Sequence, residues 1–269
     1  MKTISSRDNP TFKELRLLAR DARRQREEGR ALLDGPHLVT AALDKGLLPD
    51  LLAVSESALA NPEVAALLAR MAALPVLCLR DSLFRELSEL AHPVGILARI
   101  AVPINAEDTA GTVSPASTFS VTGDCLLLDA VQDAGNVGTL LRTAAAAGVR
   151  DVLLGTGCAG AWTPRVLRAG QGAHFGLNIR EQVDLSAFLR DYPGISVAAV
   201  AHAGQSLYTL DFSQPTAWLF GSEGQGVSPA LVAAARRRAT IPLAPGSESL
   251  NVGAAAAVCL FEMRRQRTI

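Results

Sequence analysis

From Asp124 onward, short apolar runs alternate with stretches of helical periodicity, and this alternation constrains the fold more than any other feature. The strand-like runs are CLLLDAV, DVLLG, LNIREQV, SVAAVA, AWLFG and TIPLA. The helical patterns are GTLLRTAAAAG, TPRVLRAG, LSAFLRDY, SPALVAAARRRA and the closing NVGAAAAVCLFEMRRQR. Alternation of this kind predicts an α/β fold, a parallel sheet with helices on both faces. Ligands of such folds bind beyond the carboxyl ends of the strands, so we expect the functional residues in those loops.

The chain is predicted to have two domains joined by a linker. Residues 1–102 contain mixed α/β patterns, among which residues 12–34 are expected to form one helix. Residues 103–123 lose all periodicity and gather Pro, Ser, Thr and Gly, which is typical of a linker. The second domain is then 124–269.

Composition restricts the classes of protein that the chain can represent. It is 49% hydrophobic and 19% charged, so it can bury a sizeable core. No stretch approaches the ~18 consecutive apolar residues of a membrane helix, and the start MKTISSRDNP lacks the apolar region of a signal peptide. We therefore expect a soluble cytoplasmic protein without membrane contact. Four Cys and four His are scattered without metal-ligand spacing, which predicts reduced thiols and no metal site.

The formal net charge of zero hides a segregation of charge. Residues 1–30 carry 9 Lys or Arg against 5 Asp or Glu, a net charge of +4. Residues 236–269 carry 6 against 2, again +4. Two basic ends suggest a footprint for a polyanion, although solvated helix faces explain Arg runs equally well.

The stretch GTGCAG at 155–160 follows a strand-like run and matches the G-x-G-x-x-G of a dinucleotide-binding turn, with Glu181 beyond it as the companion acid. This gives one candidate function, an enzyme using NAD(P) or FAD. Against it, Gly160 is followed by Ala-Trp-Thr-Pro, so the next helix cannot sensibly begin before Thr163. We favour a flexible strand-to-helix connection, with Glu181 matching by distance alone.

Three other loops at predicted strand ends combine glycines with polar residues. In the first, Asn136 stands at a helix N-cap position, with Arg142 further along the helix. In the second, GSEGQG surrounds Glu223 with three glycines, more than a turn requires. In the third, Ser249 and Asn251 precede an Ala-rich helix, and capping explains only one of them. Caps and turns are the structural interpretation of each loop, and a ligand site is the functional one.

Taken together, the loops resemble a known family. The patterns NxGxxxR (from Asn136), GSEGQG (from Gly221) and IPLxxGxxSLNV (from Ile241) are similar to the three signature motifs of the SpoU (TrmH-type) RNA ribose methyltransferases of the SPOUT superfamily. The stretch TPRVLRAGQGAHFGLNI resembles the segment between the first two motifs. The N-terminal ISSRDNPTFKELRLLARDARRQREEGRALLDGPHLV resembles the substrate-binding domain that precedes the catalytic domain in relatives.

The resemblance implies a fold and an activity. The C-terminal domain would contain a deep trefoil knot that binds S-adenosylmethionine, and two subunits would pair so that each site draws on both chains. The smaller N-terminal α/β domain would be L30e-like. The reaction implied is transfer of a methyl group to a ribose 2′-hydroxyl of structured RNA, with rRNA favoured and tRNA as the other choice.

The resemblance also assigns roles to residues. Catalytic or site-shaping roles fall to five residues: Arg142, Asn136, Glu223, Ser249 and Asn251. Cofactor binding falls to five others: Gly221, Ile241, Leu250, Gly226 and Ala201. Because Arg does not deprotonate in proteins, we assign Arg142 to stabilising the developing alkoxide or phosphate rather than to general-base catalysis. The N-terminal arginines expected to bind RNA are Arg16, Arg20, Arg23, Arg24 and Arg26.

Three positions depart from the family pattern. Ala134 stands where Pro is usual, Gly170 where Ser is usual, and Gly253 where Ser usually follows Asn-Val. The first is expected to loosen the turn before the helix, and the other two to remove hydroxyls near the substrate. His37 and His174 are expected to be structural or surface residues. Besides the dinucleotide enzyme, a non-catalytic RNA-binding protein is an alternative, which the intact Asn136, Arg142 and Glu223 disfavour.

Overall fold

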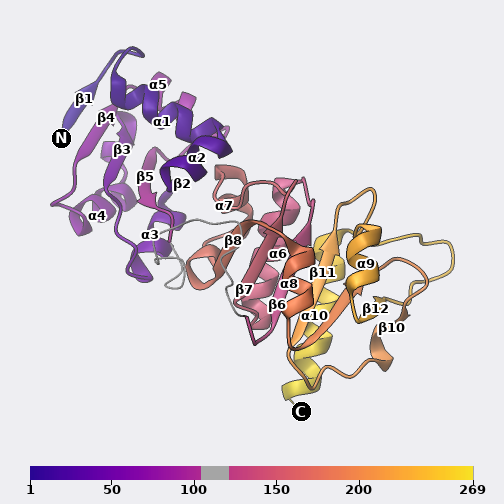
Figure 1. Ribbon diagram of the computed structural model, residues 1–269. Coiled ribbons are helices and arrows are strands. Elements are labelled where there is room, and N and C mark those ends of the chain that lie inside the picture. The colour runs from indigo at the N-terminus through magenta and orange to yellow at the C-terminus, as the bar shows by residue number, and fades with distance from the viewer. Residues whose placement is uncertain (104–120, 269) are drawn as a thin grey trace. The chain divides into compact units, whose positions relative to one another are not determined.

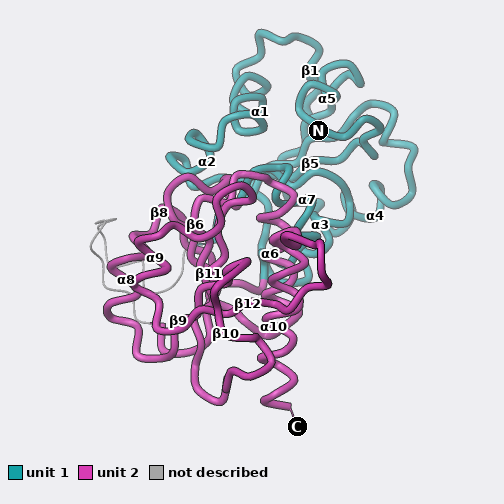
Figure 2. Tube along the Cα trace, turned by 90° about the vertical axis from the view of Figure 1, so that its right-hand side faces the viewer, with its two compact units in different colours: residues 1–103, 162–175 teal, residues 104–161, 176–269 magenta. Residues whose placement is uncertain are grey.

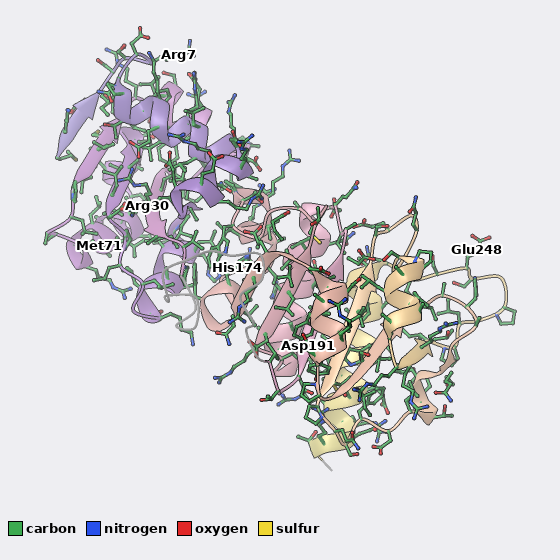
Figure 3. All side chains as sticks on the ribbon, in the orientation of Figure 1. Arg7, Arg30, Met71, His174, Asp191 and Glu248 are labelled. Atoms are coloured by element: carbon green, nitrogen blue, oxygen red, sulfur yellow. The ribbon has the colours of Figure 1, made fainter. Side chains whose placement is uncertain are left out.

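The computed structural model describes residues 1–103 and 121–268, and the chain divides into two compact units (Figures 1 and 2). Unit 1 contains Met1–Pro103 and Trp162–Phe175, and unit 2 contains Ile104–Ala161 and Gly176–Ile269. The chain therefore passes between the units three times. Apart from its ends, the predicted linker 103–123 lies outside the described residues.

Unit 1 is built on a mixed five-stranded sheet of order β1-β4-β3-β5-β2. β5 is antiparallel to both of its neighbours, and the other pairs are parallel. The strands are β1 (Lys2–Ile4), β2 (Arg30–Asp34), β3 (Leu51–Ser55), β4 (Val76–Leu79) and β5 (Ile96–Ala101). The helices are α1 (Pro10–Arg20), α2 (Ala22–Glu28), α3 (Pro36–Asp44), α4 (Pro62–Arg70), α5 (Asp81–Leu87) and α7 (Pro164–Gly170), with 3₁₀ turns η1 (Ser57–Ala60) and η3 (Ala173–Gly176).

The single helix predicted for residues 12–34 is wrong, because the segment contains two helices and a strand. Asp21 ends α1 and caps α2, its carboxylate accepting hydrogen bonds from the backbone N–H groups of Arg23 and Arg24. Gly29, at φ 59°, closes α2 in the left-handed conformation that glycine adopts without strain. The chain then enters β2, whose central residues are buried.

The segment 162–175 belongs to unit 1, although it connects two strands of unit 2. Arg165 Nε donates to Glu89 Oε2 at 3.0 Å, and the Trp162 and His174 rings lie 5.3 Å apart between centroids. A Cβ added to Gly172 would lie 2.8 Å from the Cβ of Ala41, which shows close packing. The predicted division into 1–102 and 124–269 differs from the observed units in this segment.

Unit 2 is built on a seven-stranded sheet, and every pair in it is parallel. The strand order is β10-β12-β9-β11-β6-β7-β8. The strands are β6 (Cys125–Asp129), β7 (Asp151–Gly155), β8 (Asn178–Val183), β9 (Ile195–Ala199), β10 (Gln205–Ser206), β11 (Thr216–Gly221) and β12 (Arg237–Thr240). The predicted α/β fold with a parallel sheet is confirmed.

Helices cover both faces of this sheet, as Figure 2 shows for α8 and α9 on one side and α6 and α10 on the other. They are α6 (Ala134–Ala147), α8 (Leu185–Asp191), α9 (Pro229–Ala234) and α10 (Val252–Thr268), with a 3₁₀ turn η4 (Leu207–Thr209). Leu185 and Leu231 pack against Leu127, Leu153 and Leu219 of the strands. Among the described residues, no helix has the length and apolar character needed to cross a bilayer.

The prediction of a helix over 228–239 followed by a strand at 240–244 is wrong in its boundaries. The helix α9 ends at Ala234, and Arg237–Thr240 forms β12 between β9 and β10. Arginine has a high helix propensity, so the local pattern favours a helix. The open edge of β9 provides ladder hydrogen bonds that outweigh this preference.

The strand order determines where the site is built. β12, β9, β11 and β6 are consecutive neighbours, so their carboxyl ends lie at one edge of the sheet. The three polar loops predicted from the sequence follow β6, β11 and β12. Segments more than 80 residues apart in the chain therefore meet at this edge.

Candidate cofactor and catalytic site

A cavity of about 510 Å³ lies at the carboxyl edge of the unit 2 sheet. Its walls come from the ends of β9, β11 and β12, from the loop after β11 and from the start of α10. The volume is within the range of small-molecule sites, which runs from ~300 to ~1,000 Å³. The cavity therefore lies where the strand pattern places a ligand.

The loop Ser222–Val227 is closed on itself by backbone hydrogen bonds. Gly226 N donates to Ser222 O at 2.8 Å, and Ser222 N donates to Gly226 O at 3.1 Å. A Cβ on Gly221 would lie 2.0 Å from the carbonyl carbon of Gly226, and Gly226 itself has a φ of 68°. The loop thus requires glycine at both positions, and it holds Glu223 at its tip.

Asp129 anchors the far end of this loop. The carboxylate Oδ2 of Asp129, the last residue of β6, accepts a hydrogen bond from Ser228 N at 2.7 Å. Because Ser228 immediately precedes α9, the bond fixes both the loop and the start of that helix. The sequence interpretation did not single out Asp129, although its place at a strand end was a signal for it.

Side chains from all three loops are joined by hydrogen bonds. Asn136 Nδ2 donates to Glu223 Oε1 at 2.8 Å, and Asn251 Nδ2 donates to Asn136 Oδ1 at 2.9 Å. These residues are 87 and 115 positions apart in the chain. Glu223 and Asn251 line the cavity, and Asn136 supports them from the side.

The predicted caps are partly corrected. Asn136 is not the N-cap of α6; Asp133 is, its Oδ1 accepting from Asn136 N at 2.7 Å. The side chain of Asn136 is thereby free to bind Glu223 and Asn251. Asn251 does cap α10, with Oδ1 accepting from Gly253 N at 2.9 Å, while Ser249 lines the cavity.

Arg142 is not brought into this cavity. It is exposed on α6, and its side chain makes no hydrogen bond or ion pair with the described part of the chain. It lies six residues after Asn136, about 9 Å further along the helix axis. The structure of one chain therefore separates Arg142 from the other four predicted site residues.

All five residues expected to bind the cofactor line the cavity. They are Ala201, Gly221, Gly226, Ile241 and Leu250. The lining also includes Phe220, Leu243 and Cys259, which the sequence interpretation did not identify. Burial raises the pKa of Cys259 to about 12, so its thiol stays neutral and adds to an apolar wall. Apolar side chains at strand ends are also expected in the core of any α/β domain. Phe220, Leu243 and Cys259 therefore do not stand out in the sequence as cavity residues.

Comparisons with known proteins agree with this arrangement. The SpoU rRNA methylase family matches residues 125–261, and an MRM3-like substrate binding domain matches residues 9–98. The chain is 32% identical to an uncharacterized tRNA/rRNA methyltransferase of Synechocystis sp., covering 98% of this chain and 94% of the relative. It is 31% identical to the 23S rRNA (guanosine(2553)-2′-O)-methyltransferase RlmP of Bacillus subtilis, covering 98% and 100%. The solved AdoMet-bound rRNA methyltransferase of Sinorhizobium meliloti superposes with a TM-score of 0.81 at 26% identity, covering 98% and 97%.

The chain belongs to the SpoU rRNA methylase family. The structure places each of its three departures from the family pattern. Ala134 is the first residue of α6. Its replacement of proline is expected to loosen the turn before the helix, but the Asp133 side chain caps α6 and holds this turn. Gly253 packs against α6, because a Cβ there would lie 2.8 Å from Thr139 Cγ2. Gly170 is buried at the end of α7.

In this SpoU family member, GTGCAG connects β7 to α7 and does not open a helix. Helix α7 begins at Pro164, after Thr163 as expected. The connection is tied down rather than flexible. Ala159 N donates to Val131 O at 2.9 Å, and Ala161 N donates to Glu181 Oε1 at 2.9 Å. Glu181 thus holds the connection in place by accepting this hydrogen bond. Its position beyond GTGCAG is explained without a bound dinucleotide.

The arginines expected to bind RNA lie on two helices, α1 and α2, rather than one. Most have partners within unit 1. Arg16 lies 3.6 Å from Glu86, Arg20 donates to the Glu86 carbonyl at 3.3 Å, and Arg23 pairs with Glu27 at 2.7 Å. Arg24 pairs with Glu28, and Arg26 is exposed on the same helix. These carboxylates offset part of the positive field that the sequence suggests.

The dispersed His and Cys residues form no group of three or more possible metal ligands, counting Asp and Glu, within 1–103 and 121–268. His174 is buried against Trp162, which agrees with the structural role expected for it. His37 is exposed near the start of α3. The side chains of all four cysteines are free thiols.

Proposed function

We propose that this chain transfers a methyl group from S-adenosylmethionine to a ribose 2′-hydroxyl of structured RNA, with rRNA as the first choice and tRNA as the second. The observation that carries the proposal is the hydrogen-bonded set Asn136–Glu223–Asn251 at the edge of a cavity whose walls are partly polar and partly apolar. Membership of the SpoU family supports it, as do the names of the Bacillus subtilis relative and the AdoMet-bound structure.

The cavity fits the proposed cofactor. Its volume of about 510 Å³ suits a nucleoside-sized ligand, and Ala201, Ile241 and Leu250 provide apolar surfaces for an adenine ring. Gly221 allows the backbone of the loop to close against it, and a Cβ added to Gly226 would meet no atom within 4 Å. When bound, the cofactor supplies a methyl group that its sulfonium already makes electrophilic.

The protein's task is to align the ribose hydroxyl and to help remove its proton. Orientation of this kind supplies much of the acceleration in enzymes. One oxygen of Glu223 is held by Asn136, which leaves the other carboxylate oxygen for the hydroxyl. Arg142 keeps its charge, and we assign it to the phosphate or developing alkoxide of the target nucleotide. Asn251 and Ser249 complete the polar wall.

A homodimer and a knotted unit 2 form part of the proposal. Arg142 lies outside the cavity of its own chain, and the family resemblance implies that each site of a dimer draws on both chains. Leu250 and Phe261, exposed by 41% and 46%, are apolar positions that such a partner would cover. The trefoil knot and the L30e-like character of the N-terminal domain are proposed from the family resemblance.

We further propose that the N-terminal unit binds RNA and that the protein acts in the cytoplasm. The match of residues 9–98 to a substrate binding domain supports the first point. The proposed phosphate contacts come from the arginines of α1 and α2, which are Arg16, Arg20, Arg23, Arg24 and Arg26. The relative that acts on 23S rRNA supports the second point.

The test is incubation of the protein with S-adenosylmethionine carrying a tritiated methyl group and with total rRNA and tRNA, followed by mapping of the labelled nucleotide. We expect a single ribose-methylated position in one RNA. Binding of RNA and S-adenosylmethionine without transfer would instead support the non-catalytic alternative. Binding of NAD(P) or FAD with no affinity for S-adenosylmethionine would revive the dinucleotide alternative.

A further inference from the structure

Three polar side chains form a row along α6, from the hydrogen-bonded set at the cavity to Arg142. Asn136, Thr139 and Arg142 are three residues apart, and residues at i and i+3 are neighbours on a helix surface. At about 1.5 Å per residue, Thr139 lies midway along the ~9 Å between the other two. A molecule that contacts both ends of the row therefore passes over Thr139.

The neighbouring helix sets the orientation of Thr139. A Cβ built on Gly253 of α10 would lie 2.8 Å from Thr139 Cγ2 and 3.4 Å from Thr139 Cβ. The methyl group of the threonine thus occupies the space over the glycine. The hydroxyl, on a different branch of the same carbon, is turned away from it. Thr139 is exposed, and its hydroxyl has no hydrogen-bond partner within the described residues.

We propose that Thr139 is a substrate-binding residue whose hydroxyl donates a hydrogen bond to an oxygen of the RNA sugar-phosphate backbone at the target nucleotide. The inference rests on the proposed function and adds a residue outside the family motif positions named above. Threonine hydroxyls are frequent donors to phosphate and sugar oxygens of nucleic acids. A nucleotide that reaches from the cavity to an arginine at the far end of the row presents such oxygens above Thr139.

Gly253 has a defined part in this arrangement, because it leaves room for the threonine methyl group. Serine at this position would place its Cβ within 3 Å of that methyl. Threonine has few staggered side-chain conformations, so a movement of the methyl also moves the hydroxyl. Glycine in place of the usual serine at position 253 is thus explained by its packing against the methyl group of Thr139.

The first experiment compares T139V, which removes the hydroxyl at nearly constant shape, with T139S, which keeps it. We expect T139V to lower kcat/KM for RNA by about 10- to 100-fold, the effect of losing a hydrogen bond to a charged group. Affinity for S-adenosylmethionine, measured by titration calorimetry, and the melting temperature should stay at wild-type values. T139S should retain most activity. The matched control is T143V, one turn further along α6, beyond Arg142.

The second experiment is a double-mutant cycle between Thr139 and Gly253. We expect G253S to reduce kcat/KM for RNA at least tenfold and the double variant T139S/G253S to recover most of the loss, because serine at 139 lacks the crowded methyl. If G253S does not fold, which its melting curve will show, the comparison of T139V with T139S decides alone.

Failure of the inference and failure of the proposed function give different results. If the wild-type protein labels no RNA, the proposed function fails and the inference fails with it. If the wild type labels RNA and T139V equals it, or T143V loses as much, only the role of Thr139 is overturned. Loss of cofactor affinity in T139V equal to its loss of activity would also overturn it, because the hydroxyl would then act through the cavity.

Discussion

At the scale of single residues, Asn136 shows why an amide is placed between a carboxylate and a second amide. A carboxylate accepts hydrogen bonds but cannot donate them, so Glu223 accepts a hydrogen bond from Nδ2 of Asn136. The Oδ1 of Asn136 is then left to accept from Asn251. Aspartate in place of asparagine has nearly the same shape but no donor.

Asn136→Asp is therefore expected to lower methyl transfer by about 100-fold or more, since it removes one hydrogen bond and places a carboxylate against Glu223. Titration calorimetry should show S-adenosylmethionine affinity falling by a smaller factor. The control is the double variant N136D/E223Q, in which the Gln amide can donate to the new Asp. Its fold and cofactor binding should recover while methyl transfer stays low. Full recovery of activity would contradict a direct role for the Glu223 carboxylate.

Arg142→Ala is expected to abolish methylation while leaving affinity for S-adenosylmethionine nearly unchanged, because the guanidinium does not line the cavity of its own chain. Methylation is measured as tritiated methyl groups transferred to RNA that is collected on filters. Affinity for S-adenosylmethionine is measured by titration calorimetry. The matched control is Arg190→Ala, an exposed arginine on α8 in the same unit. Equal losses of cofactor binding and activity would remove Arg142 from the role assigned to it.

At this scale, Asn136, Glu223 and Asn251 stand out in the sequence as polar residues at strand ends, and hydrogen bonds join them in the structure. Their roles in the reaction stay predictions. The cap of α6 was assigned to Asn136 because Asn and Asp are about equally good N-caps, and Asp133 lies one turn earlier. Only the path of the chain out of β6 decides between them.

At the scale of elements, the loop after β11 permits a sharp comparison between two glycines. Gly221→Ala would place a Cβ 2.0 Å from the backbone of Gly226. No flexible side chain can move aside there, so the loop must open. We expect loss of S-adenosylmethionine binding and a lower melting temperature.

Gly224→Ala is the control within the same loop, because no atom lies within 4 Å of its added Cβ. We expect wild-type cofactor affinity and a change in stability within about 0.5 kcal/mol, as for most surface substitutions. Melting curves and calorimetry on both variants check the pair. Similar defects in the two would show that the loop is sensitive to any loss of glycine rather than to the close approach at Gly221.

The elements that were predicted wrongly share one physical cause. Residues 30–34 and 237–240 have local patterns suited to helices, yet both form strands that complete a sheet. The antiparallel pairing of β2 with β5 and the parallel pairing of β12 with β9 supply backbone hydrogen bonds over long sequence separations. Local periodicity carries no information about those partners, whereas buried runs such as CLLLD in β6 are visible from sequence.

At the scale of the whole molecule, the placement of 162–175 in unit 1 makes a prediction about fragments. A fragment of residues 124–269 keeps α7 but lacks Ala41 and Glu89, against which the segment packs. Val166 and Leu167, buried in the full chain, would then be exposed.

We expect limited proteolysis to cut the fragment within 162–175 and to spare this segment in the full chain, with mass spectrometry identifying the sites. A protease that cuts both proteins there at equal rates would show that unit 1 gives the segment no protection. The boundaries inferred from sequence did not anticipate this, because a chain that leaves one unit and returns has no signature in composition.

The interleaved strand order of unit 2 also has a consequence for synthesis on the ribosome. β6 is made first, but β11, which separates it from β9, is made roughly ninety residues later and β12 later still. Until then, one edge of β6 stays open and β9 has neither neighbour, a state that exposes strand edges to aggregation. The hydrogen bond between Asn136 and Asn251 forms later still, because Asn251 is synthesised after β12. A nascent chain thus completes the hydrogen-bonded set Asn136–Glu223–Asn251 only in the last steps of its elongation.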